Sequence, residues 1–432
     1  MKCAGEPVLV TFDEWTRGRT VASLGTNSGA NELPFQSWRH FKEAFAPELV
    51  AQAVTQSTIP VTRCLDPFGG SGTTALACQF LGVHPITAEV NPFLADLIEA
   101  KLSLYDPDKL AHDLGTVVRT APSSAVNADC LFAHAPKTFV EPGVNGRWVF
   151  DRSIADRIAA LIAVIGALPS EMHKRLFRVL LGGILIDVSN VVVNGKGRRY
   201  RRRWEQRRRE RRSVDDLFCT SVRRAVTDLH RFSQRKTTSF DLIRGDSRKV
   251  LHRLKTCQLA IFSPPYPNSF DYTDVYNVEL WTLGYLKNGA ANQRLRASTI
   301  SSHVQIGREF PDAPRGSSAL NAITKRLVAR RDELWDPRIP EMVGAYFADL
   351  SVVLDHVYRA LAPGGSAWMV IGDSSYAGIQ IPSAEIVAQI SSKRGWKVAA
   401  MDPFRSMRSS AQQGGRHELA ENLLVLRKKI TR

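Results

Sequence analysis

Four consecutive residues, Ser263-Pro264-Pro265-Tyr266, carry groups that could hold a flat molecule bearing an amine. They follow an apolar run at 259–262, which predicts a buried parallel strand. The prolines end this strand at a stiff corner, because each fixes its own φ and neither has an N–H to donate. There, the hydroxyl and the backbone carbonyls can accept from an amine while the aromatic ring stacks on its π face. The tetrapeptide alone is equally compatible with a proline-rich turn and a packing tyrosine.

A second stretch, Asp-Pro-Phe-Gly-Gly-Ser-Gly-Thr-Thr at 66–74, joins a predicted strand at 63–68 to a predicted helix at 75–81. A glycine-rich turn of this kind lets a ligand approach the backbone at a helix N-terminus. Glu89 ends the next predicted strand, where Rossmann-type sites bind ribose hydroxyls. The spacing matches neither GxGxxG nor a P-loop, which favours an adenosine-bearing cofactor other than NAD or ATP. A purely structural glycine turn is the alternative.

Together these stretches resemble the S-adenosylmethionine-dependent DNA amino-methyltransferases. DPFGGSGTT followed by AEVNP is similar to the first motif of that family, and SPPY to its (D/N/S)PPY motif. The resemblance covers roughly 38–102 and 238–429. It implies an α/β, Rossmann-like class I methyltransferase fold, with a mostly parallel sheet, one antiparallel strand and a helical insertion. S-adenosyl-L-methionine is the implied cofactor.

The resemblance also implies roles for single residues. Ser263, Pro264, Pro265 and Tyr266 are the expected catalytic residues: the serine and the Pro264 carbonyl would bind the target amine, and the tyrosine would stack on the base. The expected cofactor-binding residues are Phe45, Asp66, Phe68, Gly70, Gly72, Thr73, Glu89 and Asp246. Of these, Asp246 would accept a hydrogen bond from the adenine amine of the cofactor, although it is also placed to N-cap the helix that follows it.

A formal net charge of +16 points to a polyanionic partner. Residues 196–212 hold eleven basic and two acidic side chains, with Tyr200 and Trp204 between them. Arginine forks bind phosphates and aromatic rings can contact bases, so we expect this segment to contact nucleic acid, with double-stranded DNA the implied partner. A solvated helix face or a disordered arm is the alternative. The expected DNA-binding residues are Lys196, Arg198, Arg199, Arg201, Arg202, Arg203, Asp271 and Tyr272.

Asp271 and Tyr272 belong to a polar and aromatic loop directly after the Ser-Pro-Pro-Tyr corner. We expect this loop to line the base pocket, and helix capping with core packing is the alternative for each residue. Residues 287–340 are rich in Gly, Ser, Arg and Pro and give no specific signal. An acid-to-lysine pattern from Asp96 to Lys101, of the kind a nuclease uses, is interpreted as a helix surface.

The chain divides into four expected segments. Residues 1–37 form an irregular N-terminal arm, 38–105 the cofactor-binding half of the methyltransferase domain, and 238–432 its catalytic half. Residues 106–237 form a helical insertion with the arginine-rich segment, which is the candidate target-recognition region. Apolar spacing predicts two of its helices, at 149–168 and 171–188.

Composition excludes several classes of protein. A hydrophobic content of 44% and a charged content of 23% are typical of soluble globular proteins, and the sequence has no apolar run of membrane-spanning length. The first residues lack the apolar region of a secretory signal. The six cysteines are scattered without a CxxC pair, which argues against a zinc site and for a reducing compartment. We therefore expect a cytoplasmic protein with no membrane partner and no metal.

The SPPY spelling favours the cytosine-N4 branch of the family. The implied function is transfer of a methyl group from S-adenosylmethionine to the exocyclic amine of a flipped cytosine, in restriction-modification or epigenetic marking. A cognate restriction endonuclease is a possible partner. An adenine-N6 DNA methyltransferase, an RNA or tRNA base methyltransferase, and a non-catalytic DNA-binding protein with this fold remain open from the residues alone.

Overall fold

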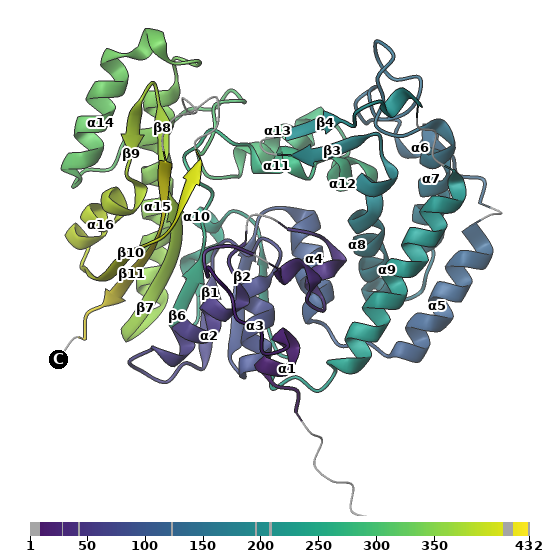
Figure 1. The fold of residues 1–432 in the computed structure, drawn as a ribbon, viewed down its shortest axis with the longest axis horizontal. Coiled ribbons are helices and arrows are strands. Elements are labelled where there is room, and N and C mark those ends of the chain that lie inside the picture. Colours follow the sequence, from purple (N-terminus) through teal and green to yellow (C-terminus); the bar gives the residue numbers. More distant parts are fainter. Residues whose placement is uncertain are drawn as a thin grey trace, which may run out of the picture.

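A central twisted sheet organises the chain (Figure 1). The computed structural model describes residues 9–27, 29–41, 44–121, 124–194, 197–206, 210–408 and 418–430. Within these residues the sheet has seven strands in the order β10-β11-β7-β6-β1-β2-β5. Their bounds are β1 Arg63–Asp66, β2 His84–Glu89, β5 Asp241–Arg244, β6 Cys257–Phe262, β7 Leu361–Gly372, β10 Trp396–Arg408 and β11 Glu418–Lys428.

The predicted fold class is confirmed. Strands β5, β2, β1, β6 and β7 are parallel, whereas β11 is antiparallel to both of its neighbours, β7 and β10. Strand order reverses between β1 and β6: the chain builds β2 and β5 on one side of β1, then returns to place β6 on the other. Open α/β sheets bind ligands at such a switch point, beyond the carboxyl ends of the strands.

Helices cover both faces of the sheet. Along β1, Cys64 belongs to one hydrophobic core and Leu65 to the other, because successive side chains of a strand point to opposite faces. The first core includes residues of α2 (Pro47–Thr55), α3 (Thr73–Leu81) and α4 (Pro92–Leu102). The second includes residues of α14 (Ser318–Ala329), α15 (Ile339–Ala360) and α16 (Ser383–Lys393). The carboxyl ends of the parallel strands lie between these two helical layers, which is where we expect a ligand to bind.

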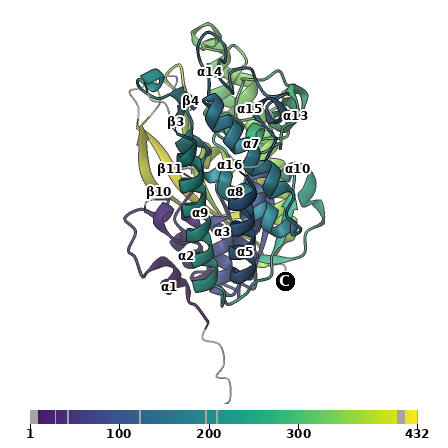
Figure 2. The ribbon, with the colours of Figure 1, turned by 90° about the vertical axis from the view of Figure 1, so that its right-hand side faces the viewer.

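The insertion forms a helical layer at one end of the molecule, which faces the viewer in Figure 2. Helix α8 joins this layer to the sheet domain, because it contacts both α9 of the insertion and α4. The helices are α5 Pro107–Thr120, α6 Ala128–Leu131, α7 Arg152–Gly166, α8 Glu171–Val188 and α9 Arg211–Arg231. The expected helices at 149–168 and 171–188 correspond to α7 and α8.

The arginine-rich segment is in part a β-hairpin, which neither the helix-face nor the disordered-arm interpretation anticipated. Strands β3 (Val191–Asn194) and β4 (Gly197–Tyr200) pair antiparallel, and a 3₁₀ turn follows at Trp204–Gln206. Trp204 is 6% exposed and packs edge-on against Trp148, so this ring serves the core of the insertion rather than its surface.

The N-terminal segment packs on the body from residue 9 onward. Helix α1 (Phe12–Thr16) begins with a capping box between Thr11 and Glu14. Trp15 is fully buried and stacks on Phe80 of α3 with ring centroids 4.8 Å apart. The described part of the expected irregular arm is therefore attached to the cofactor-binding half.

Short elements crowd the carboxyl edge of the sheet. They are α10 Ser247–Val250, α11 Tyr272–Val275, α12 Asn277–Thr282, α13 Gly289–Ala297, β8 Ser374–Tyr376 and β9 Ile379–Ile381. Helices α13 and α14 lie in the 287–340 region, where no motif predicted a specific structure. Among the helices of the described ranges, we find none with the length and apolarity to cross a membrane.

Candidate active site

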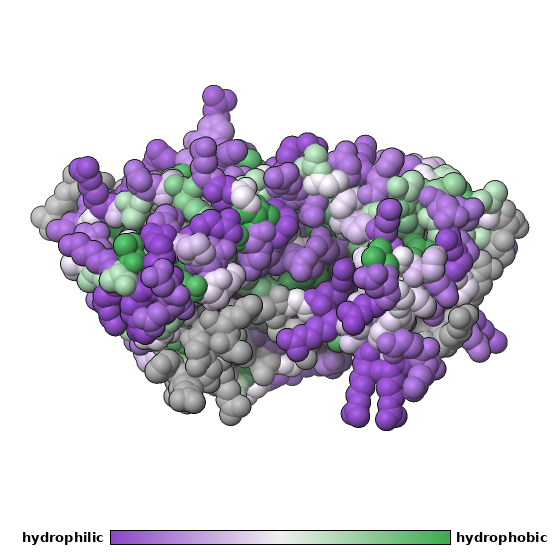
Figure 3. Space-filling view, turned by 90° about the horizontal axis from the view of Figure 1, so that it is seen from above, coloured by the Kyte–Doolittle hydropathy of each residue, from purple (hydrophilic) through white to green (hydrophobic). Residues whose placement is uncertain are grey.

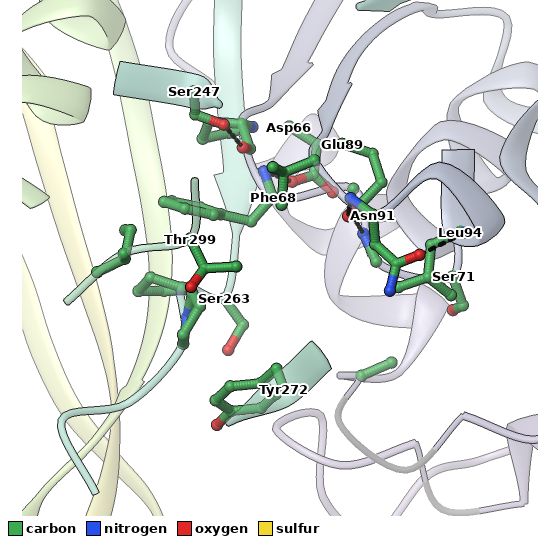
Figure 4. Close-up of a pocket in the computed structure, with 18 of the residues that line it drawn as sticks. Asp66, Phe68, Ser71, Glu89, Asn91, Leu94, Ser247, Ser263, Tyr272 and Thr299 are labelled. Carbon is green, nitrogen blue, oxygen red and sulfur yellow. Dashed lines mark hydrogen bonds between the residues drawn. The ribbon is translucent and has the colours of Figure 1, made fainter. Parts of the chain in front are cut away.

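The glycine turn after β1 and the Ser-Pro-Pro-Tyr corner after β6 line one cavity of about 400 Å³. The two strands are paired neighbours, so their carboxyl ends open on the same edge. Figure 4 shows Glu89 and Asn91 on one side of this cavity and Ser263 and Thr299 on the other, with Tyr272 along a third side. The expected site residues that line it are Phe45, Asp66, Phe68, Gly70, Thr73, Glu89, Asp246, Ser263, Pro264, Pro265, Tyr266 and Tyr272.

Two acids, Glu89 and Asp66, line the cavity next to the glycine turn, on the side where the cofactor is expected. Glu89 is 7% exposed, and its carboxylate accepts from the backbone N–H groups of Gly70 and Asn91, both at 2.7 Å. Asp66 accepts from the backbone N–H of Phe68 at 2.9 Å. Burial raises the pKa of Glu89 to about 7 and that of Asp66 to about 6. Both acids are thus fixed by the backbone of the turn, with lone pairs left for a ligand.

The glycines of the turn serve different purposes. Gly70 has φ of +52°, and a Cβ there would lie 3.1 Å from Cζ of Phe41, so both conformation and space require glycine. Gly72, an expected cofactor residue, is not part of the cavity lining. Its φ is +81°, and a Cβ would lie 3.0 Å from Ile98 of α4. Gly72 therefore permits close packing of the turn against α4.

Asp246 lines the cavity but is already engaged. It is 8% exposed, N-caps α10 through the backbone N–H of Arg248 at 3.0 Å, and pairs with the Arg248 guanidinium at 2.7 Å. Arg248 also pairs with Asp349 of α15 at 2.7 Å. An adenine amine at this position would share the Asp246 oxygens with Arg248.

Lys101 supports the glycine turn from behind. Its side chain is fully buried, and its amine donates to the carbonyl of Ser71 at 2.8 Å and to Oε1 of Gln36 at 2.9 Å. Burial lowers the Lys101 pKa to about 7. The helix-surface interpretation is therefore wrong for Lys101, because α4 turns this side chain inward. It is wrong for Asp96 too, which is buried at 9% exposure and pairs with Arg244 at 2.7 Å.

The Ser-Pro-Pro-Tyr corner is hydrogen-bonded to a strand that is distant along the chain. The Tyr266 hydroxyl donates to Glu421 of β11 at 2.9 Å and lies 3.3 Å from Oγ of Ser263. Arg405 of β10 pairs with Glu421 at 2.7 Å. Burial raises the pKa of Tyr266, which keeps the phenol protonated. Sequence reasoning missed Glu421 and Arg405 as neighbours of this corner; the one signal was an acid, Glu421, shortly before the apolar run at 423–426.

The two residues expected to line the base pocket, Asp271 and Tyr272, lie in different environments. Tyr272 lines the cavity, but Asp271 is outside the lining. Asp271 is 5% exposed, N-caps α11 through the backbone N–H of Thr273, and pairs with Arg296. Part of the wall comes instead from the region without a specific signal, through Ser298, Thr299, Ile300 and Ser302.

The arginines of the hairpin differ in their contacts. Arg199, Arg202 and Arg203 are exposed. Arg201 donates to the carbonyls of Ile186 at 2.7 Å and Ser189 at 3.1 Å, which satisfies the C-terminal end of α8. The Arg198 guanidinium lies 5.5 Å from the ring centroid of Phe139. Lys196 lies outside the described residues.

The hairpin lies beside the cavity, because β4 contacts α11, the helix that Tyr272 begins. Seen from the top of Figure 1, this side of the molecule is largely hydrophilic (Figure 3). Within the described residues, no group of three or more His, Cys, Asp or Glu side chains could hold a metal ion.

The fold and the cavity together define the class of Rossmann-like methyltransferases: a mostly parallel sheet with one inserted antiparallel strand, an acid at the end of β2, and a proline corner after β6. Residues 13–100 match the family model described as DNA methylase. Over these residues the chain is similar to the DNA amino-methyltransferases, in agreement with the resemblance of its motifs. The match begins at residue 13, which places the α1 segment inside the family region.

Several relatives match nearly the whole chain. A type II methyltransferase, M.BsoBI of Geobacillus stearothermophilus, is 23% identical over 100% of this chain and 91% of its own length. A second, M.AvaI of Nostoc sp., is 26% identical over 95% of this chain and 89% of its own length. A solved rRNA methyltransferase from Streptomyces viridochromogenes covers 89% of this chain and 85% of its own, with 10% identity and a TM-score of 0.30. We draw nothing from that weak overlap.

The family's methyl donor is S-adenosyl-L-methionine, and the cavity fits it. Its volume lies within the range of small-molecule sites. Glu89 offers carboxylate lone pairs of the kind that ribose hydroxyls require, and Gly70 keeps the backbone open to the ligand. Phe45 and Phe68 supply apolar surface. These residues are the ones expected to hold the cofactor.

Proposed function

We propose that this protein is a site-specific DNA methyltransferase that methylates the exocyclic N4 amine of a flipped cytosine. One observation carries the proposal: the glycine turn with Glu89 and the Ser263–Tyr266 corner line the same cavity. A methyl donor on the first wall and an amino base on the second would meet within it. Had these walls opened on separate surfaces, no single donor could have reached both.

The chain's own groups act by orientation. When bound, S-adenosylmethionine supplies an electrophilic methyl group. Ser263 Oγ and the Pro264 carbonyl accept from the target amine, which leaves the nitrogen lone pair directed at the donor side of the cavity. Tyr266 and Tyr272 line the cavity and offer rings against which the base can stack. Alignment of reactants of this kind is worth about 7–11 kcal/mol of barrier in favourable cases.

Cytosine is the proposed base because the first residue of the Ser-Pro-Pro-Tyr motif is a serine. This spelling is similar to that of the cytosine-N4 branch, whereas Asp or Asn is usual in the adenine-N6 branch. A base within a duplex cannot reach the cavity, so it must be flipped out of the stack. Adenine is the other amino base that would satisfy the same hydrogen bonds, and the test below separates the two.

DNA is the proposed substrate, and a restriction endonuclease is the proposed functional partner. The relatives M.BsoBI and M.AvaI, which match most of the chain, are named type II methyltransferases. The exposed arginines of the hairpin, Arg199, Arg202 and Arg203, lie on the segment that packs beside α11, and phosphates of a bound duplex would lie against them. This face is consistent with the +16 charge of the chain.

The deciding experiment incubates the protein with methyl-labelled S-adenosylmethionine and unmethylated genomic DNA. Digestion to nucleosides and mass spectrometry should give N4-methylcytosine. N6-methyladenine would keep the enzyme class and overturn the cytosine assignment. Label on tRNA but not on duplex DNA, in a parallel reaction, would overturn the substrate class.

A further inference from the structure

Glu421 is a buried acid in the last strand of the sheet. It is 2% exposed, pairs in register with Arg405 of β10 and with Gly372 at the carboxyl end of β7, and lines the cavity. A charge removed from water is costly unless it is paired and hydrogen-bonded, and such groups are frequently functional. The partners of this carboxylate therefore indicate its role.

Those partners form a chain of hydroxyls that ends at the catalytic serine. The Tyr266 hydroxyl donates to Oε1 of Glu421 at 2.9 Å, and Oγ of Ser263 lies 3.3 Å from the Tyr266 hydroxyl. Arg405 donates to both carboxylate oxygens, at 2.7 and 3.1 Å, and stabilises the negative charge. A carboxylate has no proton to give, so it can only accept.

Because the Glu421 carboxylate can only accept, the direction of each hydrogen bond in the chain is determined. Tyr266 has one O–H, which is used on Glu421, so its oxygen is left as an acceptor. Ser263 can then only donate to Tyr266. With its single proton directed away, the Ser263 oxygen presents lone pairs to the cavity. A serine without this chain could instead turn its own proton toward the target amine, where it would compete as a donor.

We propose that Glu421 is a positioning residue that fixes Ser263 as a hydrogen-bond acceptor for the target amine, acting through the Tyr266 hydroxyl. The inference rests on the proposed amine methylation and holds for cytosine or adenine alike. It explains how a serine can stand at a corner where the family also uses aspartate, since aspartate accepts without help. It also gives β11 a role in catalysis beyond completing the sheet.

The test is a set of variants assayed for turnover at saturating cofactor. Glu421→Leu and Tyr266→Phe each break the chain, and each should lower kcat about 10-fold, the worth of one hydrogen bond. The double variant should lose little more than either alone, because both changes remove the same effect. Ser263→Asp should restore most of the kcat in either background, since the introduced carboxylate accepts unaided.

Three outcomes would overturn the inference: wild-type kcat in Glu421→Leu, a multiplicative loss in the double variant, or no rescue by Ser263→Asp. Asn422→Leu is the matched control, because Asn422 is the next residue of β11 and lies outside the cavity lining, and it should retain most of the activity. If Glu421→Leu does not fold, the Tyr266→Phe background alone still tests the rescue. Folding is checked by thermal denaturation and by the cofactor Kd, neither of which a change in hydroxyl direction should move.

A binding measurement gives a readout separate from activity. Duplexes carry at the target position either the amino base or 2-pyrimidinone, which lacks the amine. Wild-type protein should bind the amino base more tightly, and Glu421→Leu should lose that preference while keeping its affinity for the analogue. Equal preferences in both proteins would contradict the inference. Absence of any methyl transfer by the wild-type protein would instead count against the proposed function, so the two failures are distinct.

Discussion

The two walls of the cavity are built in different ways. The cofactor wall is local: Gly70 donates to Glu89, 19 residues along the chain, and both belong to one strand–helix–strand unit. The catalytic wall is long-range: Tyr266 donates to Glu421, 155 residues away, on β11, which pairs with β7 and β10. The first wall can form with its own unit, whereas the second depends on completion of the sheet. Changes on the two walls should therefore affect different kinetic parameters.

The largest effect is expected from Tyr266→Ala on the catalytic wall. The change removes a stacking ring, worth about 1–3 kcal/mol per base, and leaves Glu421 without its hydroxyl donor. We expect kcat to fall about 100-fold while the cofactor Kd changes less than about 2-fold. Single-turnover kinetics and isothermal titration measure the two quantities. Ser263→Ala should show the same split with a smaller loss, and a matching rise in cofactor Kd in either variant would show that the walls are not independent.

Glu89→Gln makes the converse change on the cofactor wall. It keeps the shape but removes the charge that would accept from ribose hydroxyls, and hydrogen bonds to charged groups are worth about 1.5–3 kcal/mol. We expect the cofactor Kd to rise about 10- to 100-fold with kcat at saturating cofactor near the wild-type value. A loss of kcat without a change in Kd would contradict the assignment of Glu89.

The free energy of unfolding should depend on pH through Glu89 of the cofactor wall. The pKa of Glu89 rises from 4.5 to about 7 because of burial, so the folded protein holds this proton more tightly than the unfolded chain. The Glu89 contribution to folding is therefore fully present below pH 4.5 and is lost as the pH rises toward 7, by an amount on the order of 3 kcal/mol. Glu89→Gln removes the titration. Denaturant unfolding without cofactor should show a shallower loss of stability between pH 4.5 and 7 for the variant. Parallel curves would contradict the prediction.

The same contrast explains what the sequence could predict. The strand–turn–helix pattern around Gly70 and the acid at Glu89 are local signals, because one supersecondary unit carries the whole cofactor wall. The proline corner was also readable, since Pro264 and Pro265 fix their own backbone. The mostly parallel sheet with one antiparallel strand was expected from the resemblance to the family rather than from periodicity.

The parts that were not predicted depend on tertiary contacts. Thr299 lines the cavity although it follows α13 in a region without a motif. Glu421 looks like the polar end of a strand until Tyr266 is placed against it. Asp271 has the composition of a pocket residue, but the neighbouring Arg296 and the N-terminus of α11 satisfy it elsewhere. The spacing of residues along the chain does not predict these pairings.

The smallest effect is expected at the hairpin, where two neighbouring arginines provide a matched pair. Arg202 is exposed, whereas Arg201 donates to the carbonyls of Ile186 and Ser189 at the end of α8. Arg202→Ala should weaken DNA binding a few-fold, equally for all sequences, and reduce the slope of log Kd against log salt by about 1. Arg201→Ala should instead lower the free energy of unfolding by about 1–3 kcal/mol, because it removes two hydrogen bonds at the end of α8 and the Ser189 carbonyl loses the Arg201 donor. Fluorescence anisotropy at several salt concentrations and denaturant unfolding separate the two. If Arg201→Ala changed only the salt slope, the carbonyl contacts would have no structural weight and the whole hairpin would act as a DNA-binding surface.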